Sequence, residues 1–115
     1  YTKPVYLLTS QQSASATDMM ALSSMELNNF KRIGSHTNGA ISDALQKTLP
    51  NGWYFSLSNE VYTDNNDKCY ENIGVPVNYE LNYPNDRQAF FRSVANDLEK
   101  DKKNILNAIN KLQSE

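Results

Sequence analysis

The first thirty residues predict a strand, a tight polar turn and a helix in direct succession. Val5 to Thr9 is a short apolar run with β-branched and aromatic side chains, which is typical of a buried strand in a parallel sheet. Ser10 to Ser13 is polar and turn-like, and apolar residues then recur at helical spacing from Ser15 to Phe30. This unit predicts an α/β layer fold.

The middle of the chain predicts mainly strands. Residues 45–49 fit either a helical turn or an extended segment, and Pro50-Asn51-Gly52 is a clear turn signal. The aromatic residues that follow this turn are expected to pack in the core and against the hairpin. Further extended segments are expected at 31–34, 53–58, 60–63 and 75–81.

The last thirty residues predict helix. Asp86 is placed as an N-cap, and apolar residues recur at helical spacing from Arg87 to Leu112, with a break or solvated turn at 100–103. We therefore expect a core portion at 1–83 and a helical extension at 84–115 that packs on the same domain. Four side chains of this extension are expected to be buried: Phe90, Phe91, Val94 and Leu98.

Composition excludes several classes of protein. The chain has 115 residues, 39% of them apolar and 21% charged, which fits one globular domain at most and not a disordered segment. A net charge of -2 gives no basic face for nucleic acid. A single cysteine, Cys69, forms no disulfide within the chain. Because the sequence opens at Tyr1 directly before a strand, we expect a cut inside a larger protein.

The junction between the first strand and the first helix is the candidate chemical site. A serine in such a turn exposes its hydroxyl at the end of the sheet, and the helix N-terminus offers N–H groups to a developing oxyanion. From the residues alone, Ser15 fits this role only weakly, and an ordinary helix N-cap is the commoner reason for a serine at such a position. Ser13 and Thr17 flank it, so the nucleophile position is open to a slip of two residues.

Four blocks of the sequence, in order, resemble the motifs of tail-specific (C-terminal-processing) and tricorn-core serine peptidases. Residues 13–18 (SASATD) are similar to the Ser-Ala-x-Glu motif around the nucleophile, and residues 33–39 (IGSHTNG) to the Gly-Glu-x-Thr-x-Gly loop. The Leu-Pro-Asn-Gly … Leu-Ser hairpin is matched at 48–60, and the Glu-x-x-Gly-(Val/Ile)-x-Pro segment at 70–76. The resemblance covers roughly residues 4 to 81.

The resemblance implies a partial crotonase-like (ClpP-like) α/β core and a serine-type endopeptidase in the full-length parent. It places the nucleophile at Ser15, an oxyanion donor at the N–H of Ala16, and at Glu71 a carboxylate that orients the base or binds the substrate's amino end. It implies a peptide or protein substrate and no metal or organic cofactor. It leaves the compartment open among periplasmic, extracellular and membrane-associated.

The general base is expected outside the chain. Ala40 stands where the tail-specific branch has its catalytic lysine, so the chain is closer to the tricorn-like and interphotoreceptor-retinoid-binding branch, whose histidine comes from the upstream half of the domain. The chain's own His36 is an alternative base, although a loop histidine bonded locally is the simpler interpretation. Asp18 and Ser35 depart from the usual glutamates of their motifs, which indicates a divergent member.

Two alternatives to catalysis stay open at this point. The same fold carries an apolar ligand in the retinoid-binding relatives, and it can also serve as a plain structural or interaction domain. The isolated fragment is expected to be inactive because it lacks a convincing base. It is also expected to self-associate, since a divided sheet leaves an unpaired edge. Its expected partners are the substrate and the upstream half of the same domain, and no nucleic acid.

Overall fold

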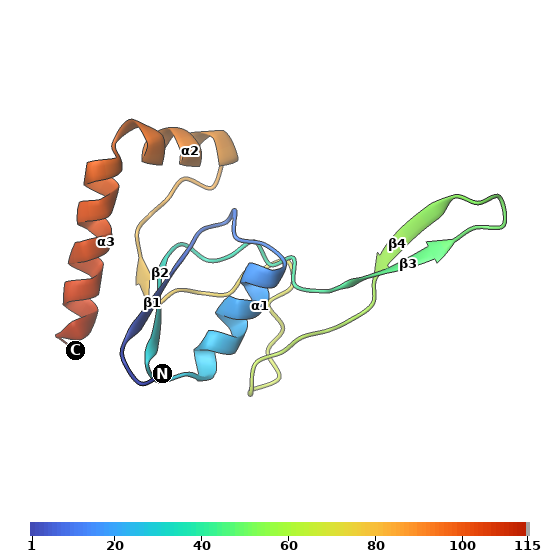
Figure 1. Ribbon diagram of the computed structural model, residues 1–115, viewed down its shortest axis with the longest axis horizontal. Helices are drawn as coiled ribbons and strands as arrows, with labels where there is room; N and C mark the ends of the chain where they lie inside the picture. The colour runs from blue at the N-terminus through green and yellow to red at the C-terminus, as the bar shows by residue number, and fades with distance from the viewer. Residues whose placement is uncertain (115) are drawn as a thin grey trace.

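A computed structural model describes residues 1–114 and gives a small α/β body with one projecting hairpin (Figure 1). The α/β class predicted from the sequence is confirmed. The elements in chain order are β1 (Val5–Thr9), α1 (Ala16–Ser23), the 3₁₀ turn η1 (Ser24–Glu26), β2 (Phe30–Gly34), β3 (Ala44–Thr48), β4 (Tyr54–Ser58), β5 (Tyr79–Glu80), α2 (Arg87–Asn96) and α3 (Leu98–Gln113).

The central sheet has three parallel strands in the order β1-β2-β5. Val5 to Thr9 pairs with Phe30 to Gly34 over its full length, so the predicted parallel strand is confirmed. Its predicted burial is not, because β1 lies at the edge of the sheet and Leu8 is 51% exposed. β5 is only two residues long, where the sequence predicted a strand over 75–81. The expected strand near 60–63 is reduced to one isolated bridge between Thr63 and Cys69.

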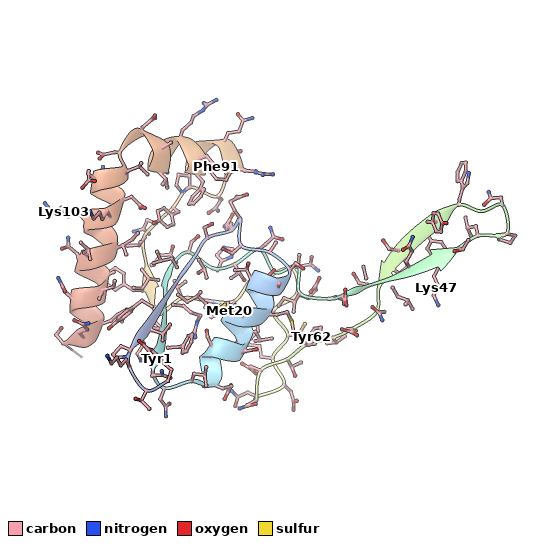
Figure 2. All side chains as sticks on the ribbon, in the orientation of Figure 1. Tyr1, Met20, Lys47, Tyr62, Phe91 and Lys103 are labelled. Atoms are coloured by element: carbon pink, nitrogen blue, oxygen red, sulfur yellow. The ribbon has the colours of Figure 1, made fainter. Side chains whose placement is uncertain are left out.

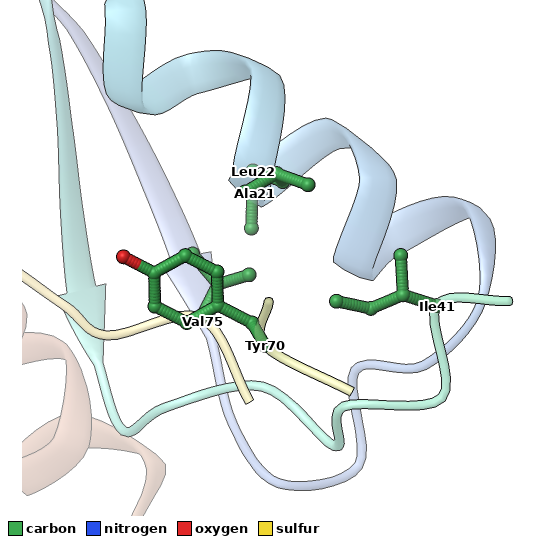
Figure 3. Packing of buried hydrophobic residues seen from close by; sticks show 5 residues of the cluster. All are labelled: Ala21, Leu22, Ile41, Tyr70 and Val75. Atoms are coloured by element: carbon green, nitrogen blue, oxygen red, sulfur yellow. The ribbon is translucent and has the colours of Figure 1, made fainter. Parts of the chain in front are cut away.

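Two helices lie on opposite sides of this sheet, with α1 on one side and α3 on the other (Figure 1). The α1 side contains a small apolar cluster in which side chains from the helix meet side chains from two loops (Figure 3). Its members are Ala21, Leu22, Ile41, Tyr70 and Val75. Ile33 of β2 and Ala108 of α3 are fully buried as well.

The first helix is shorter than predicted, because Ser24 makes tertiary contacts that the sequence pattern does not reveal. Its hydroxyl donates to the carbonyl of Ala21 at 2.7 Å and accepts from the guanidinium of Arg32 at 3.3 Å. A serine bonded back to the preceding turn competes with regular helix. The chain therefore tightens into a 3₁₀ turn at Ser24–Glu26 and becomes extended at Leu27.

The C-terminal helical region is confirmed, but it divides at Asp97 and not at residues 100–103. Asp97 accepts a hydrogen bond from the N–H of Lys100 and so starts α3, as Asp86 starts α2 by accepting from Ala89. Phe90 and Val94 are half-buried, whereas Phe91 and Leu98 are more than half exposed. The prediction of burial was wrong for the latter two: α2 buries no residue completely, and the buried residue of α3 is Ala108 and not Leu98.

The hairpin β3–β4 projects from the body, and every residue of its two strands is exposed (Figures 1 and 2). Its register places Leu45 opposite Leu57 and Lys47 opposite Phe55, so these four side chains share one face. Trp53 and Tyr54 at its tip are 71% and 69% exposed. The prediction that this aromatic cluster packs in the core was wrong.

Candidate functional site

Ser15 lies at the sharp turn between the β1 segment and α1, in a strained conformation. Its φ is 56° and its ψ is -119°, outside the regions that a non-glycine residue favours. Strain of this kind persists only where the surrounding structure imposes it, and a strained strand-to-helix turn is the usual setting of an exposed nucleophilic serine. Ser15 occupies the N-cap position of α1, yet its hydroxyl makes no capping hydrogen bond.

The turn before Ser15 is fixed by its own polar side chains. The hydroxyl of Ser13 accepts from the N–H of Ser10 at 3.1 Å, and the hydroxyl of Ser10 accepts from the N–H of Gln12 at 3.2 Å. The carbonyl of Ser13 accepts from the N–H of Asn38 at 2.8 Å. The hydroxyl of Ser13 is therefore used in the turn, in contrast to that of Ser15.

The loop after β2 supports Ser15 from the other side. The carbonyl of Ala40 accepts a hydrogen bond from the N–H of Ser15 at 3.2 Å. Asp18, a fully buried residue in the first turn of α1, accepts from the N–H of Gly39 at 2.9 Å and from that of Ala40 at 3.2 Å. The sequence singled out Asp18 as a departure from the usual glutamate of its motif, and its loop partners are a structural finding.

Glu71 binds the same loop two residues farther along. One of its carboxylate oxygens, Oε2, accepts from the N–H of Ile41 at 2.8 Å and from the N–H of Ser42 at 2.9 Å. The predicted carboxylate therefore lies beside the loop that supports Ser15, and its bonds are to backbone amides.

A pocket of about 200 Å³ opens directly at Ser15. Met19 and the buried Ile41 give it apolar walls, and Ser42, whose N–H is bound by Glu71, is part of its lining. The sequence pointed to Ser15 and Ala16 here, and it missed the other five lining residues because four of them lie far from Ser15 in the sequence. The complete lining is Ser15, Ala16, Met19, Ile41, Ser42, Asp43 and Tyr62.

Two carboxylates lie at or beside this pocket: Asp43 lines it, and Glu60 binds the lining residue Tyr62. The hydroxyl of Tyr62 donates a hydrogen bond to the carboxylate of Glu60. That hydrogen bond raises the pKa of Tyr62, with smaller contributions from burial and from the charges of Glu60 and Asp43.

The N–H of Ala16 follows Ser15 directly, at the start of α1. No hydrogen bond within residues 1–114 uses it, whereas the N–H groups of Ser15, Thr17 and Met19 are all bonded to carbonyls. Free amides at a helix N-terminus bind negative charge. The residue that the sequence identified as an oxyanion donor thus retains an available donor.

His36 uses both ring nitrogens for local contacts. Nδ1 lies 2.8 Å from the carbonyl oxygen of Thr37, and Nε2 lies 2.9 Å from the side-chain nitrogen of Gln11. Because a carbonyl only accepts and an amide NH₂ only donates, the ring carries its proton on Nδ1 and accepts at Nε2. His36 is not among the residues that line the pocket at Ser15.

A second cavity of about 200 Å³ lies between the end of β1 and the C-terminal helices, with Leu8, Phe90 and Ile105 among its lining residues. Tyr83 borders this cavity and donates a hydrogen bond to Asp101 at 2.7 Å. Burial of the phenol, and to a smaller extent this hydrogen bond, raises the pKa of Tyr83 well above its ordinary value.

Within residues 1–114, no group of three or more His, Cys, Asp or Glu side chains is arranged to hold a metal ion. No helix in that range is long and apolar enough to cross a bilayer.

Solved structures similar to this chain include a mature CPAF complexed with lactacystin, which is 23% identical with a TM-score of 0.70 over 96% of this chain. A candidate peptidase from Parabacteroides merdae is 26% identical over 70% of the chain, with a TM-score of 0.61. A lipoprotein from Streptococcus agalactiae is 25% identical over 78% of it, with a TM-score of 0.58. The chain spans 22%, 25% and 32% of these three proteins respectively.

No protein with a curated description matches the sequence. The sequence profile of peptidase family S41 matches residues 1–81, from the start of the chain through β5. The match includes the Ser15 turn, the loop after β2 and Glu71, and it confirms the predicted resemblance to tail-specific peptidases. The chain belongs to peptidase family S41.

Proposed function

We propose that this chain supplies the nucleophile half of a serine endopeptidase active site, with Ser15 as the nucleophile. The observation that carries the proposal is the strained backbone of Ser15, whose uncapped hydroxyl opens onto a pocket. An ordinary helix cap would bond its hydroxyl to the helix and would need no strain. Ser13 is a weaker candidate because its hydroxyl is bonded within the turn.

In the proposed reaction, the Oγ of Ser15 attacks the scissile carbonyl and forms an acyl-enzyme. The proton of Ser15 passes to a base and then to the departing amine, and water hydrolyses the ester. The unused N–H of Ala16 stabilises the oxyanion. Glu71 supports the site indirectly, through the backbone of Ile41 and Ser42.

The base is proposed to be a histidine outside these 115 residues. Ala40 occupies the position of the lysine in tail-specific relatives, and the ring of His36 is committed to Thr37 and Gln11. This favours the tricorn-like branch of the family. The chain covers about a fifth to a third of similar proteins, which leaves room for the base in a longer parent.

Two consequences concern the isolated chain. We expect the pure 115-residue chain to be inactive toward peptides, because it contributes no free base. We expect it to self-associate through the open edge of β1, with residues 84–115 packed on the 1–83 core as part of the same domain. Ser15-dependent cleavage by the pure chain, or a strict monomer in light scattering at high concentration, would contradict these expectations.

The test is peptide hydrolysis by the full-length parent with three variants of one turn. Ser15→Ala is expected to lower kcat by about 10⁴-fold or more. Ser13→Ala and Thr17→Ala are matched controls in the same turn, and each is expected to keep kcat within about tenfold. Loss of activity in Ser13→Ala alone would move the nucleophile by two residues. Full peptide hydrolysis by Ser15→Ala would reject Ser15 as the nucleophile, whereas a folded wild-type parent that hydrolyses no peptide would favour the alternative of a ligand-binding or structural domain.

A further inference from the structure

Asp18 has no role in the proposed chemistry, yet it is the most completely enclosed carboxylate beside Ser15. It is 0% exposed, and each of its oxygens accepts one hydrogen bond, Oδ1 from Gly39 and Oδ2 from Ala40. A buried carboxylate without a cationic partner is costly unless donors satisfy it. Here the donors are two backbone amides, and the first turn of α1 adds its favourable dipole.

The contacts of Asp18 continue directly to Ser15. The N–H of Ala40 donates to Asp18, and the carbonyl of Ala40 accepts from the N–H of Ser15 at 3.2 Å. Met19 in turn donates its N–H to the carbonyl of Ser15 at 3.0 Å. The backbone of Ser15 is thus held at both its N–H and its carbonyl, and one of these bonds depends on where Asp18 fixes Ala40.

Asp18 and Glu71 together bind four successive backbone amides. Asp18 takes those of Gly39 and Ala40, and Glu71 takes those of Ile41 and Ser42. We call this arrangement the carboxylate clamp. Its segment, residues 39–42, supplies both the acceptor for Ser15 and two residues that line the pocket, Ile41 and Ser42.

We infer that Asp18 is a positioning residue, which acts through Ala40 to hold Ser15 in its strained conformation and to set the wall of the pocket. The inference rests on the proposed function. A misplaced nucleophile slows the chemical step more than it weakens substrate binding. Loss of the clamp should therefore lower kcat with little change in KM.

The test uses the full-length parent and compares four variants in one peptide-hydrolysis assay. Asp18→Asn keeps the size but replaces an acceptor oxygen with a donor, so kcat should fall about 100-fold at nearly unchanged KM. Asp18→Glu keeps the carboxylate but displaces it by one methylene, so kcat should fall by a smaller factor, about three- to tenfold, at nearly unchanged KM. Asp86→Asn alters a carboxylate that accepts from a backbone amide at the start of α2, and should leave kcat unchanged. Ser15→Ala reports on the proposed function itself.

The outcomes distinguish the role of Ser15 as the nucleophile from the role of Asp18 as a positioning residue. If Ser15→Ala is inactive while Asp18→Asn keeps full kcat, the positioning role is wrong and the proposed function stands. If Ser15→Ala is fully active, the proposed function fails, and the inference fails with it. Where Asp18→Asn does not fold, Asp18→Glu decides alone: a lower kcat at unchanged KM supports the role, and full kcat despite a lower melting temperature overturns it.

Discussion

The Ser15 turn and the β3–β4 hairpin are both short turns joined to regular structure, and they are built in opposite ways. The Ser15 turn is tied to the loop after β2 by backbone bonds to Ala40 and Asn38, next to a cluster of buried side chains. The hairpin is held mainly by its own strand pairing and turn bonds, and its strand residues are all exposed (Figure 2). Tertiary contacts fix the conformation of the Ser15 turn, whereas the hairpin depends on pairing between its own two strands.

This difference explains why a strained residue is found in the Ser15 turn, which is surrounded by tertiary contacts, and why the exposed hairpin is less able to hold one. A residue in an unfavourable conformation, such as Ser15, can persist only where neighbours impose that conformation. An isolated two-stranded hairpin is marginal in water, so the hairpin is the natural place for local opening. Matched substitutions in the two regions should therefore have very different effects on the free energy of unfolding.

The largest contrast is expected between two glycines, both with φ of 85°. A Cβ on Gly74 would lie 2.1 Å from the carbonyl oxygen of Thr37, whereas a Cβ on Gly52 would meet nothing within 4 Å. Gly74→Ala should lower the free energy of unfolding by about 4 kcal/mol or more. Gly52→Ala should cost only the left-handed backbone penalty, about 1 kcal/mol. Urea denaturation measures both, and equal costs would contradict the contrast.

A smaller contrast is expected for apolar truncation. Ile33 is fully buried in β2, and Leu57 of the hairpin is 61% exposed. Ile33→Ala removes buried methyl groups and should cost about 3 kcal/mol. Leu57→Ala should change the free energy of unfolding by less than about 0.5 kcal/mol. A large cost at Leu57 in the same denaturation experiment would show that the hairpin's apolar face is covered in solution.

The third contrast uses one type of hydrogen bond in two settings. The hydroxyl of the buried Thr37 accepts from the N–H of Val75 at 2.8 Å, and Asn51 in the hairpin turn accepts from the N–H of Trp53 at 3.1 Å. Thr37→Val leaves a buried donor unpaired and should cost about 2 kcal/mol. Asn51→Ala leaves a donor that water can satisfy and should cost about 0.5 kcal/mol. Thermal melting of the two variants would rank them, and the reverse order would refute this reasoning.

The smallest effect is expected at Tyr83, where the C-terminal helix joins the body. Its raised pKa means that the protonated phenol is favoured in the folded state, so this stability is present below about pH 10 and is lost as pH rises further. Tyr83→Phe should cost about 1 kcal/mol at neutral pH, because Asp101 loses its donor. The variant's melting temperature should also decline less steeply than the wild type's above pH 10, and parallel declines would exclude this titration.

The local elements were predictable where a pattern is continuous along the chain. The apolar run of β1 and the helical spacing after Asp86 identify those elements directly. Element ends that depend on tertiary bonds were not predictable. Ser24 ends the first helix through its contact with Arg32, which belongs to a different strand.

The candidate site was predictable only in part. Motif resemblance identifies Ser15, Ala16 and Glu71, and the family match supports membership without testing their roles. The clamp by Asp18 was not predictable, because its partners lie 21 and 22 residues away and are backbone amides. The exposure of Trp53 was missed for a related reason: alternation indicates a strand but does not say what covers it.

The most direct test of the central claim is to locate the covalent adduct of a fluorophosphonate probe on the full-length parent by peptide mass spectrometry. Such probes label serines whose hydroxyl is activated by a base and an oxyanion site. We expect one adduct, on Ser15, that is lost in Ser15→Ala and retained in Ser13→Ala. A folded, catalytically competent parent that carries its adduct on another serine, or carries none, would contradict it.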